Sequence, residues 1–366
     1  MSLLQQTCDE IEPQDRSARR RARERLEQLA MPHWALGRVM DLSVELAGIT
    51  QSLQPAVERK NVVVMAGDHG VAEAGVSKYP REVTGQMLYN FVDGGAGINA
   101  LAGCVDAGVT VVDMGVAAEV GDLAESGEIL SKSVRAGTNN IAEGPAMSRD
   151  EAVRAVEGGI EVALELGDGV DVFGTGDMGI ANTTPSAAIA AAVTGGDPAE
   201  VTGRGTGVDD EQLEHKRDIV GKALEVNDVN PADGLDLLSK VGGFEIGGIA
   251  GLILGAARCR KPVLVDGFIS TAGALIAHAL CADSADYMIA AHRSEEHGHA
   301  LMHRKLGKEP LLDLDLRLGE GTGAALAMGL VDGAASLLTD VNTFEEAAIA
   351  VPGKNSNRTG HAGKQK

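Results

Sequence analysis

The chain has 366 residues, with 32 Lys and Arg against 53 Asp and Glu, and its formal net charge is −21. That charge repels phosphate backbones and anionic lipid, and the longest uncharged apolar run, residues 246–257, is too short to cross a bilayer; we expect no nucleic-acid or membrane partner. The four cysteines form no C-x-x-C pair and no basic segment precedes an apolar stretch at the start, so we expect a cytoplasmic protein without a zinc ribbon or disulfide framework.

The first part of the chain has the apolar spacing of helices. Residues 16–59 lack short β-branched runs and place apolar side chains such as Val39, Leu42 and Leu46 at helical intervals. Six arginines fall between residues 16 and 25, a pattern that can bind nucleic acid. In so acidic a chain we favour a solvated helix face over a nucleic-acid site. The last residues, 353–366, are typical of a frayed polar tail.

From residue 61 the pattern changes to short apolar runs that alternate with Ala-rich helical stretches. A helix is predicted over residues 148–166, where Ser148 and Glu151 form a capping box, and another over 184–193, with Pro185 in its first turn. This alternation predicts an α/β fold with a parallel sheet covered on both faces, whose ligands bind at the carboxyl ends of the strands. The predicted strands are residues 62–66, 109–114, 170–173, 263–265, 287–291 and 311–318.

Two glycine-rich segments are candidate phosphate sites. Residues 174–179 (GTGDMG) follow a predicted strand and precede Asn182, Thr183 and Thr184, where the free N–H groups of a helix start favour an anion. Residues 203–207 (GRGTG) can form a backbone nest, and Lys216 follows. Together these segments favour a phosphorylated sugar as ligand. Tight turns and a solvated lysine are the alternative, and G-x-G-x-x-G also matches the weak fingerprint of a nicotinamide-dependent dehydrogenase.

Glu320 is the candidate catalytic base. It stands between Gly319 and Gly321 after the last predicted strand, so its carboxylate can project past the strand end without crowding. A carboxylate in an apolar pocket has a raised pKa and can act as a base near neutral pH. The alternative is that Glu320 caps the following helix.

The histidines at the end of the sheet suggest a metal site at first sight. His299 and His303 are four residues apart, as in a zinc-binding helix. No carboxylate lies between them in the H-E-x-x-H arrangement, so we favour histidines on a helix surface and expect no metal.

Several segments together resemble the nicotinate-nucleotide:dimethylbenzimidazole phosphoribosyltransferase family, which activates the lower ligand of cobalamin. The resemblance runs in unbroken order over roughly residues 35–350. The segments that carry it are residues 66–72 (AGDHGVA), 75–77 (GVS), 82–84 (EVT), 86–87 (QM), 140–147 (NIAEGPAM), 178–184 (MGIANTT), 203–207 (GRGTG), 247–251 (GGIAG), 266–268 (DGF) and 316–321 (LRLGEG).

The resemblance implies a fold, substrates and site residues. It implies a doubly wound, mostly parallel six-stranded sheet with helices on both faces (residues 61–344), a small helical domain from both chain ends (1–60 with 345–366), and a homodimer. The substrates would be nicotinate mononucleotide and a benzimidazole-type base, with Glu320 as general base and no cofactor. Binding of the base is implied for Ser77, Gln86 and Leu318. The implied nucleotide-binding residues are Asp177, Met178, Gly179, Asn182, Thr183, Thr184, Gly205, Lys216, Ser294 and Arg317.

The sequence departs from the family pattern at two places. Asp177 stands where the family usually has Glu, and its side chain is shorter by one methylene group, so the resemblance alone does not establish its contact with the ligand. Residues 31–39 (MPHWALGRV) match the usual K-P-P-G-S-L-G-R-L only in part, and no chemistry depends on them. A non-catalytic nucleotide-binding regulator and, with less support, the dehydrogenase remain the alternative functions.

Overall fold

The computed structural model describes residues 1–205 and 207–350, and its centre is a sheet of six parallel strands in the order β3-β2-β1-β4-β5-β6. The doubly wound α/β fold that the sequence predicts is confirmed. The strands of this sheet are β1 (Lys60–Gly67), β2 (Ala107–Gly115), β3 (Leu130–Ser131), β4 (Val172–Met178), β5 (Val263–Val265) and β6 (Met288–Ala290).

Both faces of the sheet are buried because successive side chains of each strand point to opposite sides. In β1, Val63 and Met65 enter one apolar cluster, and Val62 and Val64 enter the other. The first cluster contains side chains of α1 (Leu3–Glu10), α7 (Arg149–Gly167), α8 (Thr183–Thr194), α11 (Gly234–Val241), α12 (Phe244–Arg258) and α13 (Phe268–Leu280). The second contains those of α3 (Arg38–Thr50), α4 (Val83–Val92), α5 (Gly97–Gly103), α6 (Gly121–Glu125) and α15 (Thr322–Thr339).

The predicted helix signals are confirmed at their first residues. Ser148 caps α7 and exchanges hydrogen bonds with Glu151, as the capping box predicts, and Pro185 lies in the first turn of α8. The remaining helices are α2 (Arg16–Leu26), η1 (Gly70–Ala74), α9 (Pro198–Val201), α10 (Asp210–Asn227), η2 (Ala282–Tyr287) and α14 (His299–Leu306).

The predicted strand over residues 311–318 exists but does not belong to the main sheet. It is β8 (Leu312–Leu316), which pairs with β7 (His292–Ser294) in a separate parallel ladder. The sixth place in the main sheet goes to the two-residue strand β3, which pairs with β2 and is too short to give a sequence pattern.

The glycine-rich segment 174–179 is mostly a strand and not the turn that the sequence predicts. Its residues continue β4 as far as Met178, paired with β1 on one side and with β5 at its start. Gly176 is a glycine because a Cβ there would lie 2.8 Å from the carbonyl carbon of Glu320. These glycines allow close packing and are not arranged as a dinucleotide-binding turn, which disfavours the dehydrogenase.

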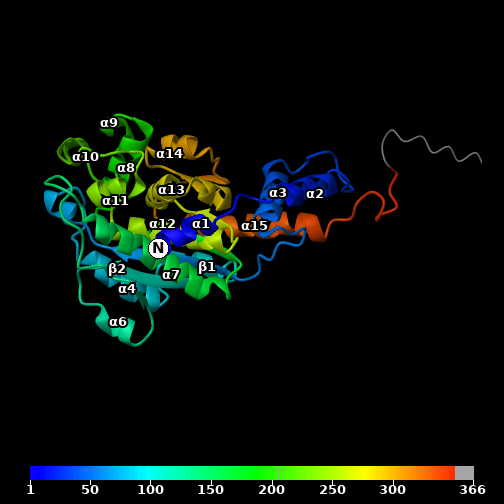
Figure 1. Ribbon diagram of the computed structural model, residues 1–366, viewed down its shortest axis with the longest axis horizontal. Coiled ribbons are helices and arrows are strands. Elements are labelled where there is room, and N and C mark those ends of the chain that lie inside the picture. Colours follow the sequence, from blue (N-terminus) through cyan, green and yellow to red (C-terminus); the bar gives the residue numbers. More distant parts are fainter. Residues whose placement is uncertain (206, 351–366) are drawn as a thin grey trace, which may run out of the picture.

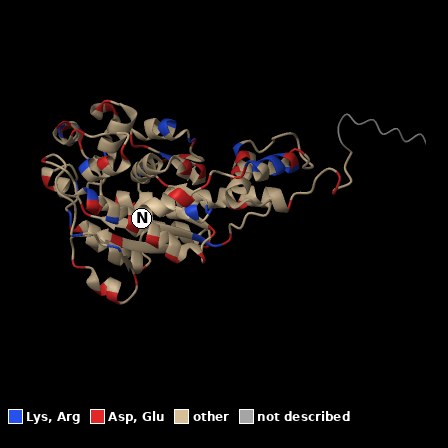
Figure 2. Ribbon diagram, in the orientation of Figure 1, with Lys and Arg blue, Asp and Glu red and all other residues tan. Residues whose placement is uncertain are grey.

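Helices α2 and α3 pack beside the far end of α15, away from the sheet (Figure 1). Ala18, Ala22 and Leu26 face inward from α2, while most of its arginines are exposed; the predicted solvated face is confirmed and forms a basic stripe in Figure 2. Helix α1 lies on the large body, where Leu4 N donates to Glu157. The division of the chain near residues 60 and 345 stays a prediction, and the predicted tail at 353–366 lies outside the described residues.

Helix α15 is long and apolar enough to span a membrane by composition alone. In the structure 61% of this stretch is buried, with Val331 and Met328 packed against the sheet. It has the burial of a core helix, and its far end packs against α2 and α3.

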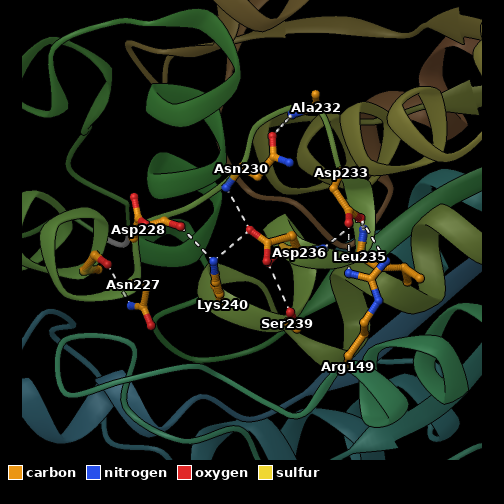
Figure 3. A network of polar contacts seen from close by, with 11 residues as sticks. Arg149, Asn227, Asp228, Asn230, Ala232, Asp233, Leu235, Asp236, Ser239 and Lys240 are labelled. Atoms are coloured by element: carbon orange, nitrogen blue, oxygen red, sulfur yellow. Dashed lines mark hydrogen bonds and ion pairs between the residues drawn. The ribbon is translucent and has the colours of Figure 1, made fainter.

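The connection from α10 to α11 is held by a network of charged side chains (Figure 3). Asp233 caps α11 and pairs with Arg149 of α7 through contacts of 2.9 and 3.2 Å. Lys240 donates to the Asp228 carbonyl at 2.7 Å and lies 3.0 Å from the Asp236 carboxylate. The network ties α7, α10 and α11 together on the side of the sheet that also carries α12.

Candidate active site

A cavity of about 380 Å³ opens at the carboxyl ends of the central strands, where the sequence places the ligand. Most of the predicted site residues line it. These are Ser77, Asp177, Met178, Gly179, Asn182, Thr183, Gly205, Ser294, Arg317, Leu318 and Glu320.

Three predicted site residues do not line the cavity. Gln86 lies on α4 with an exposed side chain, and Thr184 is fully buried one position behind Thr183. Lys216 is buried beneath the cavity wall. The apolar residues that complete the part of the cavity near Ser77 and Leu318 are Val76, Tyr79, Val83 and Met87.

Glu320 is held in a left-handed backbone conformation at the start of α15. Its φ is 62°, and those of Gly319 and Gly321 are 82° and 91°. Such a conformation is rare for a residue with a Cβ and costs about 1–2 kcal/mol. The side chain is buried, and its Oε2 accepts the N–H of Ile98 at 3.0 Å. Burial raises the pKa of Glu320, the Ile98 N–H opposes this shift, and the Asp266 carboxylate adds to it.

Two further carboxyl groups lie close to Glu320. Asp177 lines the cavity and accepts a hydrogen bond from Asn182 at 3.0 Å. Burial raises the pKa of Asp177 well above its ordinary value, and Asp266 raises it further. Asp266 accepts the N–H groups of Gly321 and Ala324, so it fixes the turn that carries Glu320. Burial and the Asp266 carboxylate therefore both disfavour the ionised form of Asp177.

Lys216 reaches the cavity wall from below. Its Nζ donates to Thr183 Oγ1 at 2.7 Å, and a Cβ at Gly205 would lie 3.0 Å from the same nitrogen. Gly205 has a φ of 52° and so needs to be glycine for its conformation as well as for its contacts. Burial lowers the pKa of the Lys216 ammonium to about 8, against the opposite effect of Glu296.

Glu296, Phe268 and His292 line the cavity as well and are absent from the predicted site. Glu296 is buried, and its Oε1 accepts the Gly205 N–H at 2.8 Å. No single-sequence signal marks it, because the contact joins residues 91 positions apart. His292 Nε2 lies 3.6 Å from Oδ1 of Asp266, the residue that fixes the turn carrying Glu320.

The expected helix-surface histidines are in fact buried. His299 is fully enclosed, and its ring lies 4.1 Å from that of His303. Thr271 Oγ1 donates to the Gly267 carbonyl, so His299 Nε2 donates to Thr271 and His299 Nδ1 accepts the N–H of Ser294 at 2.8 Å. Burial lowers the pKa of His299 well below its ordinary value. Within residues 1–205 and 207–350, no group of three potential ligands is arranged to hold a metal ion.

Comparisons with known proteins agree with this architecture. A family described as "Phosphoribosyltransferase" matches residues 11–349. Nicotinate-nucleotide–dimethylbenzimidazole phosphoribosyltransferases from Syntrophotalea carbinolica and Desulfotalea psychrophila are each 58% identical, over 96% and 97% of this chain and 99% and 100% of their own lengths. The crystal structure of the Thermus thermophilus enzyme of the same name superposes with a TM-score of 0.86 at 42% identity, covering 92% of this chain and 99% of that one. The chain belongs to the nicotinate-nucleotide–dimethylbenzimidazole phosphoribosyltransferase family.

Proposed function

We propose that this protein transfers the 5-phosphoribosyl group from nicotinate mononucleotide to 5,6-dimethylbenzimidazole or a related base, giving α-ribazole 5′-phosphate and nicotinate. The observation that carries the proposal is that Glu320 and the wall formed by Thr183 and Gly205 line one cavity, with the Lys216 ammonium directly behind that wall. A carboxylate base and a buried ammonium beside one cavity suit a reaction between a phosphorylated sugar and a neutral heterocycle.

Proton removal is the step assigned to Glu320. The pyridinium of nicotinate mononucleotide is already a cationic leaving group, so its departure needs no acid. The attacking imidazole nitrogen becomes positively charged unless the other ring nitrogen loses its proton. The raised pKa makes Glu320 a stronger base than an ordinary carboxylate, which suits it to take that proton.

Stereochemistry follows from holding the sugar at one end. A phosphate fixed near Lys216 and Gly205 would restrict the ribose, so that the new base attacks opposite the leaving nicotinate. The anomeric carbon is then inverted from β to α through an oxocarbenium-like state. Asp177 and Asn182 would contact the ribose, Ser294, Arg317 and the backbone near Gly179 would complete nucleotide binding, and Ser77 and Leu318 would flank the base.

A direct assay tests the proposal. Purified protein is mixed with nicotinate mononucleotide and 5,6-dimethylbenzimidazole, and nicotinate release and the anomeric proton of the product are followed by NMR. Formation of the α-anomer with one nicotinate per product is expected. Nucleotide binding without nicotinate release would instead support the non-catalytic regulator.

We also propose that the protein acts in the cytoplasm as a homodimer. The cysteines within the described residues are all free thiols, which suits a reducing compartment. Leu314 and Tyr89 are exposed apolar side chains that a second copy could cover. Sedimentation of the full chain at micromolar concentration measures the oligomeric state directly.

A further inference from the structure

The carboxylate of Glu296 lies where the proposed phosphate site has its donors. Its Oε1 accepts the Gly205 N–H at 2.8 Å, and a Cβ at Gly203 would overlap the same carboxylate. The Lys216 ammonium is near enough for Glu296 to oppose the lowering of its pKa. A carboxylate thus takes the backbone donor that a nest offers to an anion.

The second oxygen of Glu296 has no partner among the described residues. Oε2 is buried and accepts no hydrogen bond there, although a buried carboxylate oxygen without a partner is costly. Among residues 1–205 and 207–350, Lys216 Nζ donates a hydrogen bond only to Thr183, and an ammonium has three donors. The Glu296 carboxylate and the Lys216 ammonium, on either side of Gly205, therefore both have hydrogen-bonding capacity that the described residues do not use.

Any movement of the Glu296 carboxylate away from Gly205 would be a rotation of its side chain within the cavity that it lines. Glu296 stands in the turn between β7 and α14, and the backbone of that turn is fixed on both sides. Glu295 N donates to the Leu316 carbonyl at 3.1 Å, and His299 N donates to the Glu296 carbonyl at 3.0 Å.

We propose that the Glu296 carboxylate occupies the anion seat formed by Gly205 and Lys216, and that a substrate phosphate displaces it on binding. The inference rests on the proposed function for the identity of the substrate. Displacing the carboxylate costs the same for every ligand that carries a phosphate, so occupancy of the seat depends on the binding energy that the rest of the ligand adds. Inorganic phosphate has no ribose or pyridine to add binding energy and therefore competes poorly with the Glu296 carboxylate.

The test is Glu296→Gln, which keeps an acceptor for the Gly205 N–H and removes the charge. Glu295→Gln is the matched control, because it removes the same charge from an exposed neighbour. We expect Glu296→Gln to bind inorganic phosphate and nicotinate mononucleotide about tenfold more tightly by calorimetry, as expected for loss of a nearby like charge. Nicotinate riboside, which has no phosphate, should change by less than about twofold, and the control should match the parent.

Two results would overturn the proposal. Unchanged phosphate affinity in Glu296→Gln would show that the carboxylate does not compete for the seat, and equal weakening of nucleotide and riboside would make Glu296 a ribose-binding residue. If Glu296→Gln lowers the yield of folded protein, phosphate affinity is measured in Glu296→Asp instead. The shorter side chain withdraws from Gly205, so this variant should also bind phosphate more tightly than the parent, and an unchanged affinity would contradict the proposal. Phosphate affinity is measured without turnover, so failure of this inference and failure of the proposed transfer reaction are separate results.

Discussion

Replacement of Glu320 by Gln tests the proposed general base. The amide oxygen can still accept the Ile98 N–H, so the turn at the start of α15 should be retained. Loss of a general base costs about 10²–10⁴ in rate, which corresponds to about 2.7–5.5 kcal/mol. We therefore expect the rate to fall by at least about 10²-fold.

The assay is nicotinate release under single-turnover conditions with both substrates saturating, together with nucleotide binding by calorimetry. Binding should change little while the rate falls. A variant within about tenfold of the parent rate would refute the base assignment and leave substrate positioning as the main source of catalysis.

The pH dependence of the same pair gives an independent check. The ionised form of Glu320 is the active base, so the parent rate should fall as pH decreases through its raised pKa, and Glu320→Gln should lack that limb. The contribution of Glu320 to folding stability changes with pH in the opposite direction. A raised pKa in the folded state means that stability is full below the ordinary carboxyl pKa and is lost as pH rises through the folded value. The melting temperature of Glu320→Gln should thus exceed the parent's at neutral pH, and the difference should vanish in acid.

Substitutions at three further positions test the surroundings of Glu320 and of the proposed phosphate site. Lys216→Met keeps the buried volume. It should weaken the binding of nicotinate mononucleotide by about 1.5–3 kcal/mol and leave the binding of the benzimidazole unchanged in calorimetry. The affinity of the parent for the nucleotide should also fall as pH rises through the Lys216 pKa of about 8. Asp177→Glu should keep or improve steady-state rates and Asp177→Ala should lower them, whereas a drop in melting temperature confined to Glu with unchanged rates would mean that Asp177 only supports the turn. Gly176→Ala should cost about 1–3 kcal/mol in a denaturant titration and lower kcat by moving Glu320, and an unchanged kcat would contradict the close contact seen here.

The sequence predicts most of the sheet and most of the cavity lining because these depend on local signals. Short apolar runs followed by glycine-rich or polar turns mark β1, β2, β5 and β6, and the family resemblance adds residues such as Arg317 that no spacing rule selects. The failures depend on contacts between distant segments. The segment 174–179 reads as a turn because its glycines fit one, yet pairing with β1 keeps it extended. Burial of His299 and the contact of Glu296 with Gly205 are likewise decided only when α14 docks.

The left-handed backbone at Glu320 has a consequence for engineering and for evolution. Glycine would relieve the strain at this position, and a neutral side chain would remove the cost of burying a charge, so substitutions there should make the protein more heat-resistant as they make it inactive. A selection for thermostability alone would therefore enrich changes at Glu320. Retention of an acid between Gly319 and Gly321 in such a selection would require simultaneous pressure for turnover, and its loss would signal that this pressure had been removed.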